Sequence, residues 1–228
     1  MGFYRGPNIV TAGLVFAVDA GSTRSYAGSG TTVNNLINST TATLTNGTGF
    51  STSNGGLWTF DGTDDYIQVN TTTTPATGAF TIEFIYQISN TGGRGGMFER
   101  KPTSPYNGVT LGQGGSGDWT FSVNNGSQSV QYSATYPTTN TWYHDVGVYN
   151  GVNTVTFYRN GVLLGTTTGS TLGNLDTGGT RDDLRIFRRD STSGVIGGKV
   201  ANFRTYNVAL TAAQVLQNYN AQKSRFGL

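Results

Sequence analysis

Apolar and polar residues alternate with a period of two along most of this sequence, and clusters of Gly, Asn, Asp or Pro interrupt the alternation at short intervals. A run of this kind forms a β-strand with one buried face, and the clusters form turns. The strands are expected at residues 13–20, 57–60, 66–69, 80–88, 108–112, 118–124, 141–149, 155–167, 184–187 and 195–207. So many short strands bury their apolar faces best as an all-β sandwich of two antiparallel sheets.

Composition and charge exclude several classes of protein. The chain has 34 Gly, 12 Tyr, 12 Phe and only 11% charged residues, which is typical of a turn-rich β-protein. No apolar run approaches the roughly 20 residues that span a bilayer, so we expect no membrane partner. The net charge is +2, and Asp182 and Asp183 interrupt the one basic cluster, at residues 181–189, so we expect no nucleic acid partner.

The start of the chain and its cysteine content bear on where it is made. MGFYRG lacks the basic and then apolar pattern of a signal peptide, and the chain has 0 Cys. We therefore expect synthesis in a cytoplasm.

Two local patterns predict defined elements. Asn160-Gly161 lies between two strand-like halves, and this pair supplies the two positive φ angles of a type I′ hairpin turn. Thr211-Ala-Ala-Gln214 is a capping box, which predicts one short helix at about residues 211–220. The apolar face of that helix would consist of Val215, Leu216 and Tyr219. Residues 39–54, rich in Gly, Ser and Thr, are expected to be a surface loop.

The stretch LWTFDGTDDYIQV places Asp61, Asp64 and Asp65 between two strand-like runs. Asp61-Gly62 is a strong turn signal, because Asp bonds to the backbone two residues on and Gly accepts positive φ. A hairpin turn is therefore the favoured interpretation. The three carboxylates are also weak candidates for a Ca²⁺ site, which needs six to eight oxygens. A glycosidase would need a second acid across a cleft, and the sequence places none there.

The chain resembles the concanavalin A-like lectin/glucanase superfamily, in particular its laminin G-like and pentraxin-like jelly rolls. The resemblance rests on GLVFAVDAG, GLWTFDGTDDYIQV, AFTIEFIYQ, WYHDVGVYNGVNTVTFYRNGVLLG and IGGKVANFRTYNVALTAAQVLQNYN, which cover nearly the whole chain. It implies one domain over residues 12–228, preceded by an extension at residues 1–11. It also implies neighbouring first and last strands, with Val15 and Phe16 near residues 201–204.

The resemblance also implies that the calcium site and the catalytic acids known in other family members are missing here. Pentraxin-like members hold Ca²⁺ through two loops that correspond here to residues 104–108 and 187–191, where Asn107 and Asp190 alone keep ligand chemistry. Arg188 and Arg189 would repel the ion, so we expect that site to be lost and no cofactor to be bound. The glucanase branch carries alternating acids on one strand, whereas residues 80–88 carry Glu83 alone. An endoglycanase is therefore a distant alternative.

Other catalytic patterns are also missing, so we expect no enzyme activity. The single histidine, His144, shares a strand face with Trp142 and Val146 and is expected to be packed. The chain has no cysteine and no G-x-S-x-G motif, so neither a thiol nor an elbow serine nucleophile is indicated. The GGRGG stretch at residues 92–96 is followed by no helix pattern and is expected to be a loop.

Binding of a polysaccharide is the alternative function that the family implies. Lectin-like sandwiches stack sugars on exposed aromatic rings and bond their hydroxyls with amides. Candidates near loops are Tyr106, Asn107, Trp119, Tyr136 and Tyr149. Aromatic residues in sandwiches mostly fill the space between the sheets, so core packing competes with this role.

A narrower resemblance concerns the two ends of the chain. Residues 4–30 and 217–228 are similar to structural proteins of tailed phages, especially those infecting cyanobacteria and other marine bacteria. This implies a non-enzymatic decoration or appendage protein of the virion, made in the host cytoplasm, with capsid or tail proteins and further copies of itself as partners. The residues expected to dock onto the particle are Arg5, Pro7, Asn8, Lys223, Arg225 and Phe226.

Overall fold

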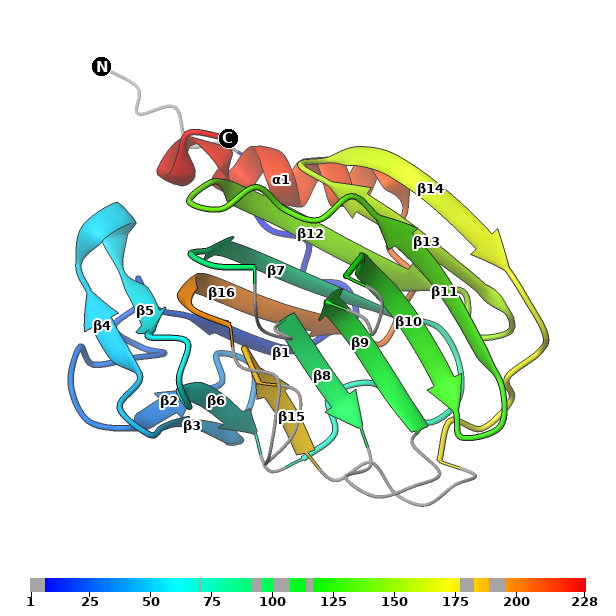
Figure 1. Cartoon of the computed structure of the whole chain (residues 1–228), viewed down its shortest axis with the longest axis horizontal. Helices are drawn as coiled ribbons and strands as arrows, with labels where there is room; N and C mark the ends of the chain where they lie inside the picture. Colours follow the sequence, from blue (N-terminus) through cyan, green and yellow to red (C-terminus); the bar gives the residue numbers. More distant parts are fainter. Residues whose placement is uncertain are drawn as a thin grey trace.

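Two antiparallel sheets face each other, and one C-terminal helix lies on the outside of the first sheet (Figure 1). This computed structural model describes residues 7–69, 71–91, 96–100, 107–113, 117–176, 183–188 and 196–228. The expected all-β jelly-roll sandwich with one C-terminal helix is confirmed.

We call the two sheets A and B. Sheet A contains, in spatial order, β14 (Val162–Thr168), β13 (Thr154–Arg159), β12 (Trp142–Tyr149), β7 (Phe80–Ile88), β16 (Gly198–Tyr206), β5 (Leu57–Phe60) and β4 (Gly49–Ser51), with β1 (Leu14–Asp19) also paired to β16. Sheet B contains β11 (Ser129–Ala134), β10 (Trp119–Asn125), β9 (Asn107–Gln113), β8 (Gly96–Arg100), β15 (Asp183–Ile186), β6 (Tyr66–Val69), β3 (Thr41–Thr45) and β2 (Thr32–Asn34). A 3₁₀ turn, Ser53–Gly55, and the helix α1 (Ala212–Phe226) complete the described elements.

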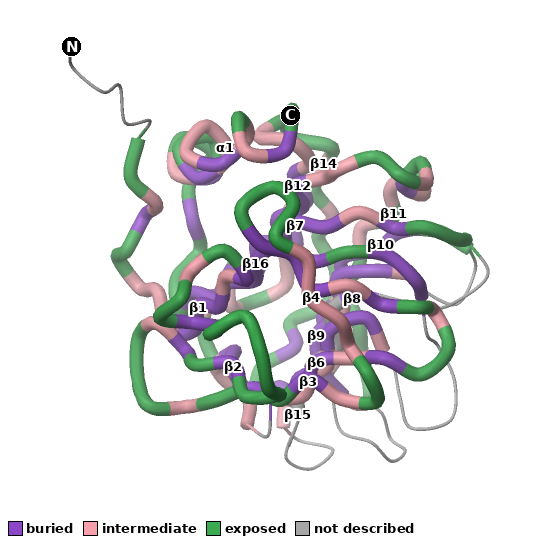
Figure 2. The backbone as a smooth tube through the Cα atoms, turned by 90° about the vertical axis from the view of Figure 1, so that its left-hand side faces the viewer, coloured by how far each residue is buried: buried purple, intermediate pink, exposed green. Residues whose placement is uncertain are grey.

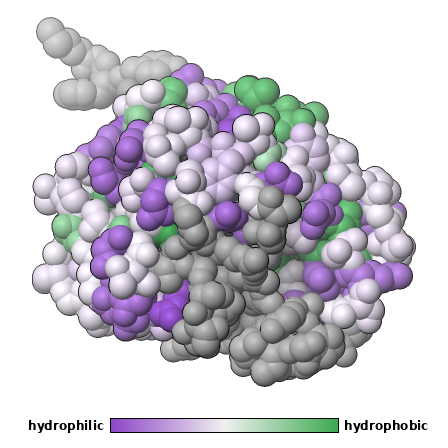
Figure 3. All heavy atoms as spheres, in the orientation of Figure 1, coloured by the Kyte–Doolittle hydropathy of each residue, from purple (hydrophilic) through white to green (hydrophobic). Residues whose placement is uncertain are grey.

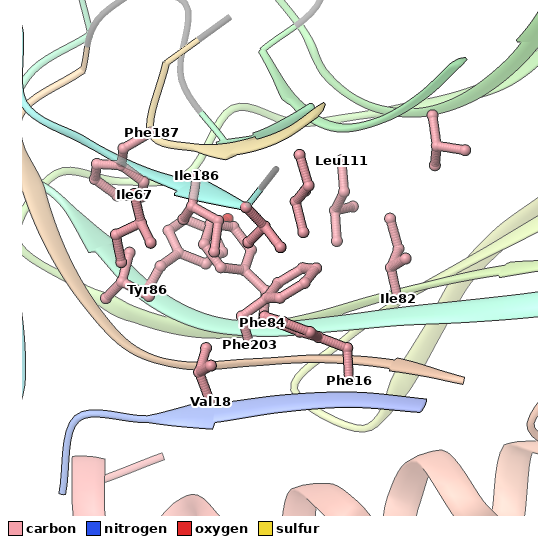
Figure 4. Packing of buried hydrophobic residues seen from close by; sticks show 14 of the residues in the cluster. Phe16, Val18, Ile67, Ile82, Phe84, Tyr86, Leu111, Ile186, Phe187 and Phe203 are labelled. Carbon is pink, nitrogen blue, oxygen red and sulfur yellow. The ribbon is translucent and has the colours of Figure 1, made fainter. Parts of the chain in front are cut away.

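Aromatic and aliphatic side chains fill the space between the sheets (Figure 4). The ring of Tyr86 stacks on Phe84 at 4.3 Å and on Trp119 of the opposite sheet at 5.0 Å. Strand β7 is buried on both faces, because the core covers one face and α1 covers the other. Figure 2 shows the same distribution, with buried segments on the inner strands and exposed segments in the connections.

The first and last strands are neighbours, as expected. Phe16 lies opposite Thr205 and Val18 lies opposite Phe203 in the β1–β16 pair. A register shift between Leu14 and Phe16 leaves Val15 outside the ladder. This bulge forms one wall of a pocket described below.

The predicted Asn-Gly turn is confirmed. Asn160 has φ 52° and Gly161 has φ 76°, and these two residues join β13 to β14. A side chain at Gly161 would meet the ring of Tyr219, with Cβ 2.9 Å from Cδ1, so the turn also packs against α1.

The capping box of α1 is confirmed, as is the burial of Val215, but the predicted length of the helix and the burial of Leu216 are wrong. Thr211 accepts from the backbone N–H of Gln214, and the helix continues to Phe226, where Gly227 ends it with φ 69°. Its buried face consists of Val215, Asn218, Gln222 and Phe226. Leu216 is 46% exposed. Two amides thus occupy the underside, which a search for apolar periodicity misses.

Residues 39–54 are not a loop. They contain β3 and β4, and only Ala42 and Leu44 of β3 face the core. We predicted a loop here because the inward-facing apolar residues of β3 are only two, Ala42 and Leu44, and Thr occupies the outward positions between them. Threonine favours strands, so the TATLT pattern carried the signal.

Residues 7–11 are not outside the fold, so the expected extension at residues 1–11 is wrong for this part. Val10 is 7% exposed, and its N–H donates to the amide oxygen of Asn218 on α1 at 2.8 Å. The side chain of Gln217 donates to the carbonyl of Asn8 at 2.7 Å. This segment, which we call the N-terminal strap, holds α1 from the side.

Exposed aliphatic side chains meet where the β13–β14 hairpin touches α1. Val162 is 64% exposed and Leu163 is 53% exposed, and Leu216 lies beside the hairpin turn. Figure 3 shows hydrophobic atoms at the top of the molecule, where Figure 1 places α1 and the start of β14. Within the described residues, no helix has the length and apolar character needed to cross a bilayer.

Candidate functional site

The DGTDD segment crosses between the sheets and is not the expected hairpin turn. Strand β5 before it pairs with β16 and β4 in sheet A, whereas β6 after it pairs with β15 and β3 in sheet B. The turn from β3 to β4 crosses between the same sheets in the opposite direction. The two crossovers lie side by side, since the Asn46 amide donates to the carbonyl of Asp64 at 3.2 Å.

Local hydrogen bonds shape both crossovers. Asp61 accepts from the N–H of Thr63 at 2.7 Å, which is the expected bond from Asp to the backbone two residues on. Asp65 accepts from the N–H of Asp61 at 3.0 Å and so closes the loop. In the other crossover, Asn46 has φ 59° and Gly47 has φ 101°. These positive angles explain why Asn-Gly occupies the turn.

A pocket of about 340 Å³ lies between the two crossovers. We call it the crossover pocket; its lining residues are Asn46, Gly47, Gly49, Thr59, Phe60, Asp61 and Asp65. Its volume is at the lower end of the range for small-molecule sites, about 300–1,000 Å³. Carboxylate, amide and hydroxyl groups converge on it, and Phe60 supplies an apolar wall.

The electrostatics of the crossover pocket are negative. The carboxylate oxygens of Asp61, Asp64 and Asp65 lie within 4.8 Å of one another. Burial raises the pKa of Asp65, and the negative charges of Asp61 and Asp64 raise it further. The hydrogen bond from the N–H of Asp61 lowers this pKa, but the net direction is upward. None of the three carboxylates forms an ion pair with a described residue. The guanidinium of Arg188 donates to the backbone carbonyl of Asp64 at 3.2 Å.

The three carboxylates are also the described residues that could hold a metal ion. Ca²⁺ prefers six to eight oxygen ligands, and this cluster offers three carboxylates. The positive charge of Arg188 beside Asp64 opposes a divalent ion. The absence of a cofactor stays a prediction.

Three of the expected sugar-binding residues are in the core. Trp119 is 0% exposed and Tyr149 is 1% exposed, so neither ring can stack on a sugar. Asn107 is 1% exposed, and its amide donates to the carbonyl of Leu175 at 2.6 Å. These assignments are wrong, because the inward positions of β9, β10 and β12 carry them into the space between the sheets.

The other two expected sugar-binding residues are Tyr136 and Tyr106. Tyr136 is half-buried and packs edge-on against Trp119 at 5.6 Å, and its hydroxyl donates to Gln113 at 3.1 Å. Burial raises the pKa of Tyr136 to about 12. Tyr106 lies outside the described residues. The structure brings none of the five candidates into the crossover pocket.

The C-terminal residues expected to dock onto a particle are engaged within the chain. Arg225 donates to both carboxylate oxygens of Asp19, at 2.8 and 3.1 Å. Phe226 is 6% exposed and packs against Trp142 at 4.9 Å. Arg225 and Phe226 therefore attach α1 to the sandwich, which corrects their assignment as docking residues.

The remaining docking candidates lie near α1 or outside the described residues. Lys223 is half-buried, with its ammonium 5.4 Å from the ring of Tyr219. Pro7 and Asn8 are exposed parts of the N-terminal strap. Arg5 is outside the described residues, as are Arg189 and Asp190 of the family calcium loop and residues 92–95 of the expected glycine-rich loop.

Sequence reasoning missed a buried polar cluster under α1. Glu83 is 0% exposed and accepts from Arg204 at 2.8 Å, from Gln222 at 2.9 Å and from Asn218 at 2.6 Å. His144 is packed there, as expected, with its Nε2 3.3 Å from Glu83. A single acid inside the apolar run FTIEFIYQI was the available signal, because an acid on a buried strand needs partners.

A family profile of the concanavalin A-like lectin/glucanases superfamily, Laminin_G_3, matches residues 61–216. The match covers more than half of the chain. The chain belongs to this family. Family members share the jelly roll seen here. The matched region begins at Asp61, so it includes the whole DGTDD crossover.

Solved structures with a similar fold come from several kinds of protein. Domain 4 of AbnA, a GH43 extracellular arabinanase from Geobacillus stearothermophilus, was solved with arabinotriose; it has a TM-score of 0.72 at 14% identity, covering 91% of this chain and 98% of that domain. The binding domain of Botulinum neurotoxin DC, solved with SialylT, has a TM-score of 0.69 at 11% identity, covering 92% and 52%. Trypanosoma rangeli sialidase has a TM-score of 0.65 at 15% identity, covering 95% and 34%.

These likenesses concern the fold alone, because the identities are low. The chain spans nearly the whole arabinanase domain, about half of the neurotoxin binding domain and about a third of the sialidase. No curated protein sequence matches the chain.

Proposed function

We propose that this protein is a non-catalytic carbohydrate-binding module and that it holds a sugar residue in the crossover pocket. The observation that carries this proposal is the convergence of Asn46, Thr59, Asp61 and Asp65 on one pocket of about 340 Å³. Sugar hydroxyls both donate and accept hydrogen bonds. Carboxylates accept from them, and the amide and the hydroxyl do both.

The negative charge of the DGTDD carboxylates favours a neutral sugar over an anionic one as the ligand. Three carboxylates within 4.8 Å of one another repel a sugar that carries a carboxylate or a sulfate. A neutral sugar avoids this cost and can donate its hydroxyl protons to Asp61 and Asp65. The arabinanase domain solved with arabinotriose supports the proposal, since it has the same fold over nearly its whole length.

The proposed absence of catalysis follows from the arrangement of the acids. Glycosidases place two carboxyl groups on opposite sides of the scissile bond. Asp61, Asp64 and Asp65 instead belong to one short loop with their carboxylate oxygens within 4.8 Å of one another, and only Asp61 and Asp65 line the pocket. Two buried acids of sheet A, Glu83 and Asp145, are each 0% exposed; Glu83 lies under α1, and Asp145 forms an ion pair with Arg159 at 2.8 Å.

A glycan array followed by calorimetric titration tests the proposal. We expect neutral oligosaccharides to bind, 3′-sialyllactose to bind much more weakly, and no reducing ends to be released on incubation. Asp65→Asn and Thr59→Val should weaken binding by about tenfold or more, the loss of one or two hydrogen bonds. Ser133→Ala on the exposed face of β11 is the matched control. Unchanged affinity in both pocket variants would refute the pocket, and release of reducing ends would refute the non-catalytic role.

The resemblance of residues 4–30 and 217–228 to phage proteins supports a second proposal about where such a module works. We propose that it is part of a phage virion, as a decoration or appendage protein in contact with capsid or tail proteins and with other copies of itself. The exposed Val162, Leu163 and Leu216 offer an apolar surface for such a contact. Mass spectrometry of purified particles tests this, and absence of the protein from particles would refute it.

A further inference from the structure

A second pocket, of about 260 Å³, lies beside the bulge of β1. We call it the threonine pocket; its lining residues are Val15, Phe16, Asn38, Thr40, Thr71, Thr72 and Thr73. None of these residues is charged. They come from three separate parts of the chain: β1, the connection from β2 to β3, and the connection from β6 to β7.

Hydrogen bonds within the chain fix one wall of the threonine pocket. The Asn38 side-chain oxygen accepts from the N–H of Thr40 at 2.9 Å and from its hydroxyl at 2.6 Å. Asn35 donates to the same oxygen at 2.7 Å. This wall is therefore ordered before any ligand arrives, which lowers the entropy cost of binding.

The bulge of β1 leaves a backbone acceptor at this pocket. Val15 lies outside the β1–β16 ladder. Its carbonyl receives the amide groups of Asn35 and Asn38, each at 3.5 Å, which is long for a hydrogen bond. The carbonyl thus keeps acceptor capacity for a ligand hydroxyl.

The lining matches the chemistry of a neutral sugar residue. Thr71 and Thr72 contribute hydroxyl groups, and the carbonyl of Val15 contributes an acceptor. The partly exposed side chain of Val15 supplies the apolar part of the lining that suits the C–H face of a sugar ring, whereas the ring of Phe16 is 2% exposed and packs in the core against Phe203. The lining contains no cation to attract an anionic group and no carboxylate to attract a cation.

The two pockets lie at opposite ends of the paired strands β3 and β6. Thr40 and Asn46 are six residues apart along β3, and Asp65 and Thr71 are six residues apart along β6. At about 3.3 Å per residue, either strand places the pockets about 20 Å apart. Ala42, Leu44, Ile67 and Val69 face the core, so the outward positions between the pockets are Thr41, Thr43, Thr45, Tyr66 and Gln68.

We propose that the threonine pocket is a second subsite for the same neutral glycan, so that the ligand is a linear polysaccharide segment that reaches both ends of the β3–β6 pair. This inference rests on the proposed function of the crossover pocket. Between the pockets, the exposed side chains of Thr41 and Thr43 present outward hydroxyl groups to the ligand. Joining two weak subsites through one ligand raises the affinity for long chains above that for short ones.

The test compares ligand length in matched variants. The probes are arabinotriose, xylotriose, cellotriose and maltotriose, and the corresponding hexasaccharides, followed by amide chemical shifts and calorimetry on the full chain. For at least one sugar, the hexasaccharide should bind the wild type about tenfold or more tighter than its trisaccharide. It should also shift the amides of residues 38–40 and 71–73. The Thr71→Val, Thr72→Val double variant should lose that gain and keep the affinity for the trisaccharide, whereas Thr138→Val on a distant loop should change neither.

Each outcome separates the two proposals. Two results would overturn the second subsite and leave the proposed function standing. In the first, trisaccharides bind at the crossover pocket and hexasaccharides bind no more tightly. In the second, hexasaccharides bind more tightly, but the double variant keeps this gain in affinity. Binding of no probe overturns the proposed function and the subsite together. Equal melting temperatures of wild type and variants show that any lost affinity does not come from unfolding.

Discussion

The guanidinium of Arg204 on β16 and the carboxylate of Glu83 on β7 form an ion pair at 2.8 Å beneath helix α1, where Glu83 is 0% exposed and Arg204 is 7% exposed. Glu83 also accepts from Asn218 and Gln222 of the helix. The pair therefore connects the two central strands of sheet A to the C-terminal helix. Its oxygens and N–H groups are satisfied within the fold, as a buried ion pair requires.

Removing one partner of this pair should strongly destabilise the protein. We expect Glu83→Ala to lower the free energy of unfolding by about 3–5 kcal/mol, because it removes the close partner of buried Arg204 and leaves only Asp19, at 4.0 Å. Guanidinium denaturation measures this. Asp64→Asn on the exposed crossover should change the same quantity by less than about 0.5 kcal/mol. A loss below about 1 kcal/mol in the Glu83 variant would mean that the cluster does not hold α1.

The same carboxylate predicts sensitivity to acid. Burial alone would raise the pKa of Glu83, but Arg204, His144 and Gln222 outweigh burial and lower the pKa from 4.5 to about 2. A pKa that is lower in the folded state stabilises the fold above the unfolded value, and this stabilisation is lost as the pH falls from 4.5 towards 2. The contribution is on the order of 3 kcal/mol.

Denaturation curves at about pH 6 and about pH 2.5 test this expectation. The wild type should lose more stability between the two conditions than Glu83→Gln, which has no proton to gain at this position. Equal losses in the two proteins would show that other carboxylates control the acid transition.

The N-terminal strap should contribute to stability through one side chain. Val10 is 7% exposed and packs with Val146, Tyr206 and Val215. We expect Val10→Ala to cost about 2 kcal/mol, from lost burial and the cavity left behind. Asn8→Ala is the control, because the described contact of Asn8 uses its carbonyl and not its side chain. If thermal melts of the two variants coincide, the packing of Val10 does not stabilise the attachment of α1 to the sandwich.

The acidic crossover should be insensitive to metal removal. The guanidinium of Arg188 lies beside Asp64, so thermal melts in EDTA and in millimolar Ca²⁺ should overlay. Asp61→Ala should cost on the order of 1 kcal/mol in either condition, through loss of the bond from Thr63. A rise of several degrees with Ca²⁺ would instead identify Asp61, Asp64 and Asp65 as ligands of an ion.

The sequence by itself determined the local elements of this protein. The alternation in FTIEFIYQI, the Asn160-Gly161 turn and the Thr211 capping box each act within a few residues, so their signals are complete in a short window. The same patterns, taken with the family resemblance, were sufficient to predict the jelly roll and the neighbouring first and last strands.

Only the tertiary structure decided how those elements combine into sites. Period-two alternation shows which residues share a strand face with Trp119 and with Tyr149. It does not show whether that face is buried or exposed, because this depends on which face the second sheet covers. In the same way, Asp61–Asp65 reads as a hairpin turn in sequence, and it is a crossover because β5 and β6 pair with strands more than 100 residues away, β16 and β15. The threonine pocket and the Glu83–Arg204 pair join residues that are distant in sequence. The crossover pocket joins residues 46–65, which come together because each of its two crossovers connects strands of different sheets. These arrangements form only when the sheets and α1 pack together.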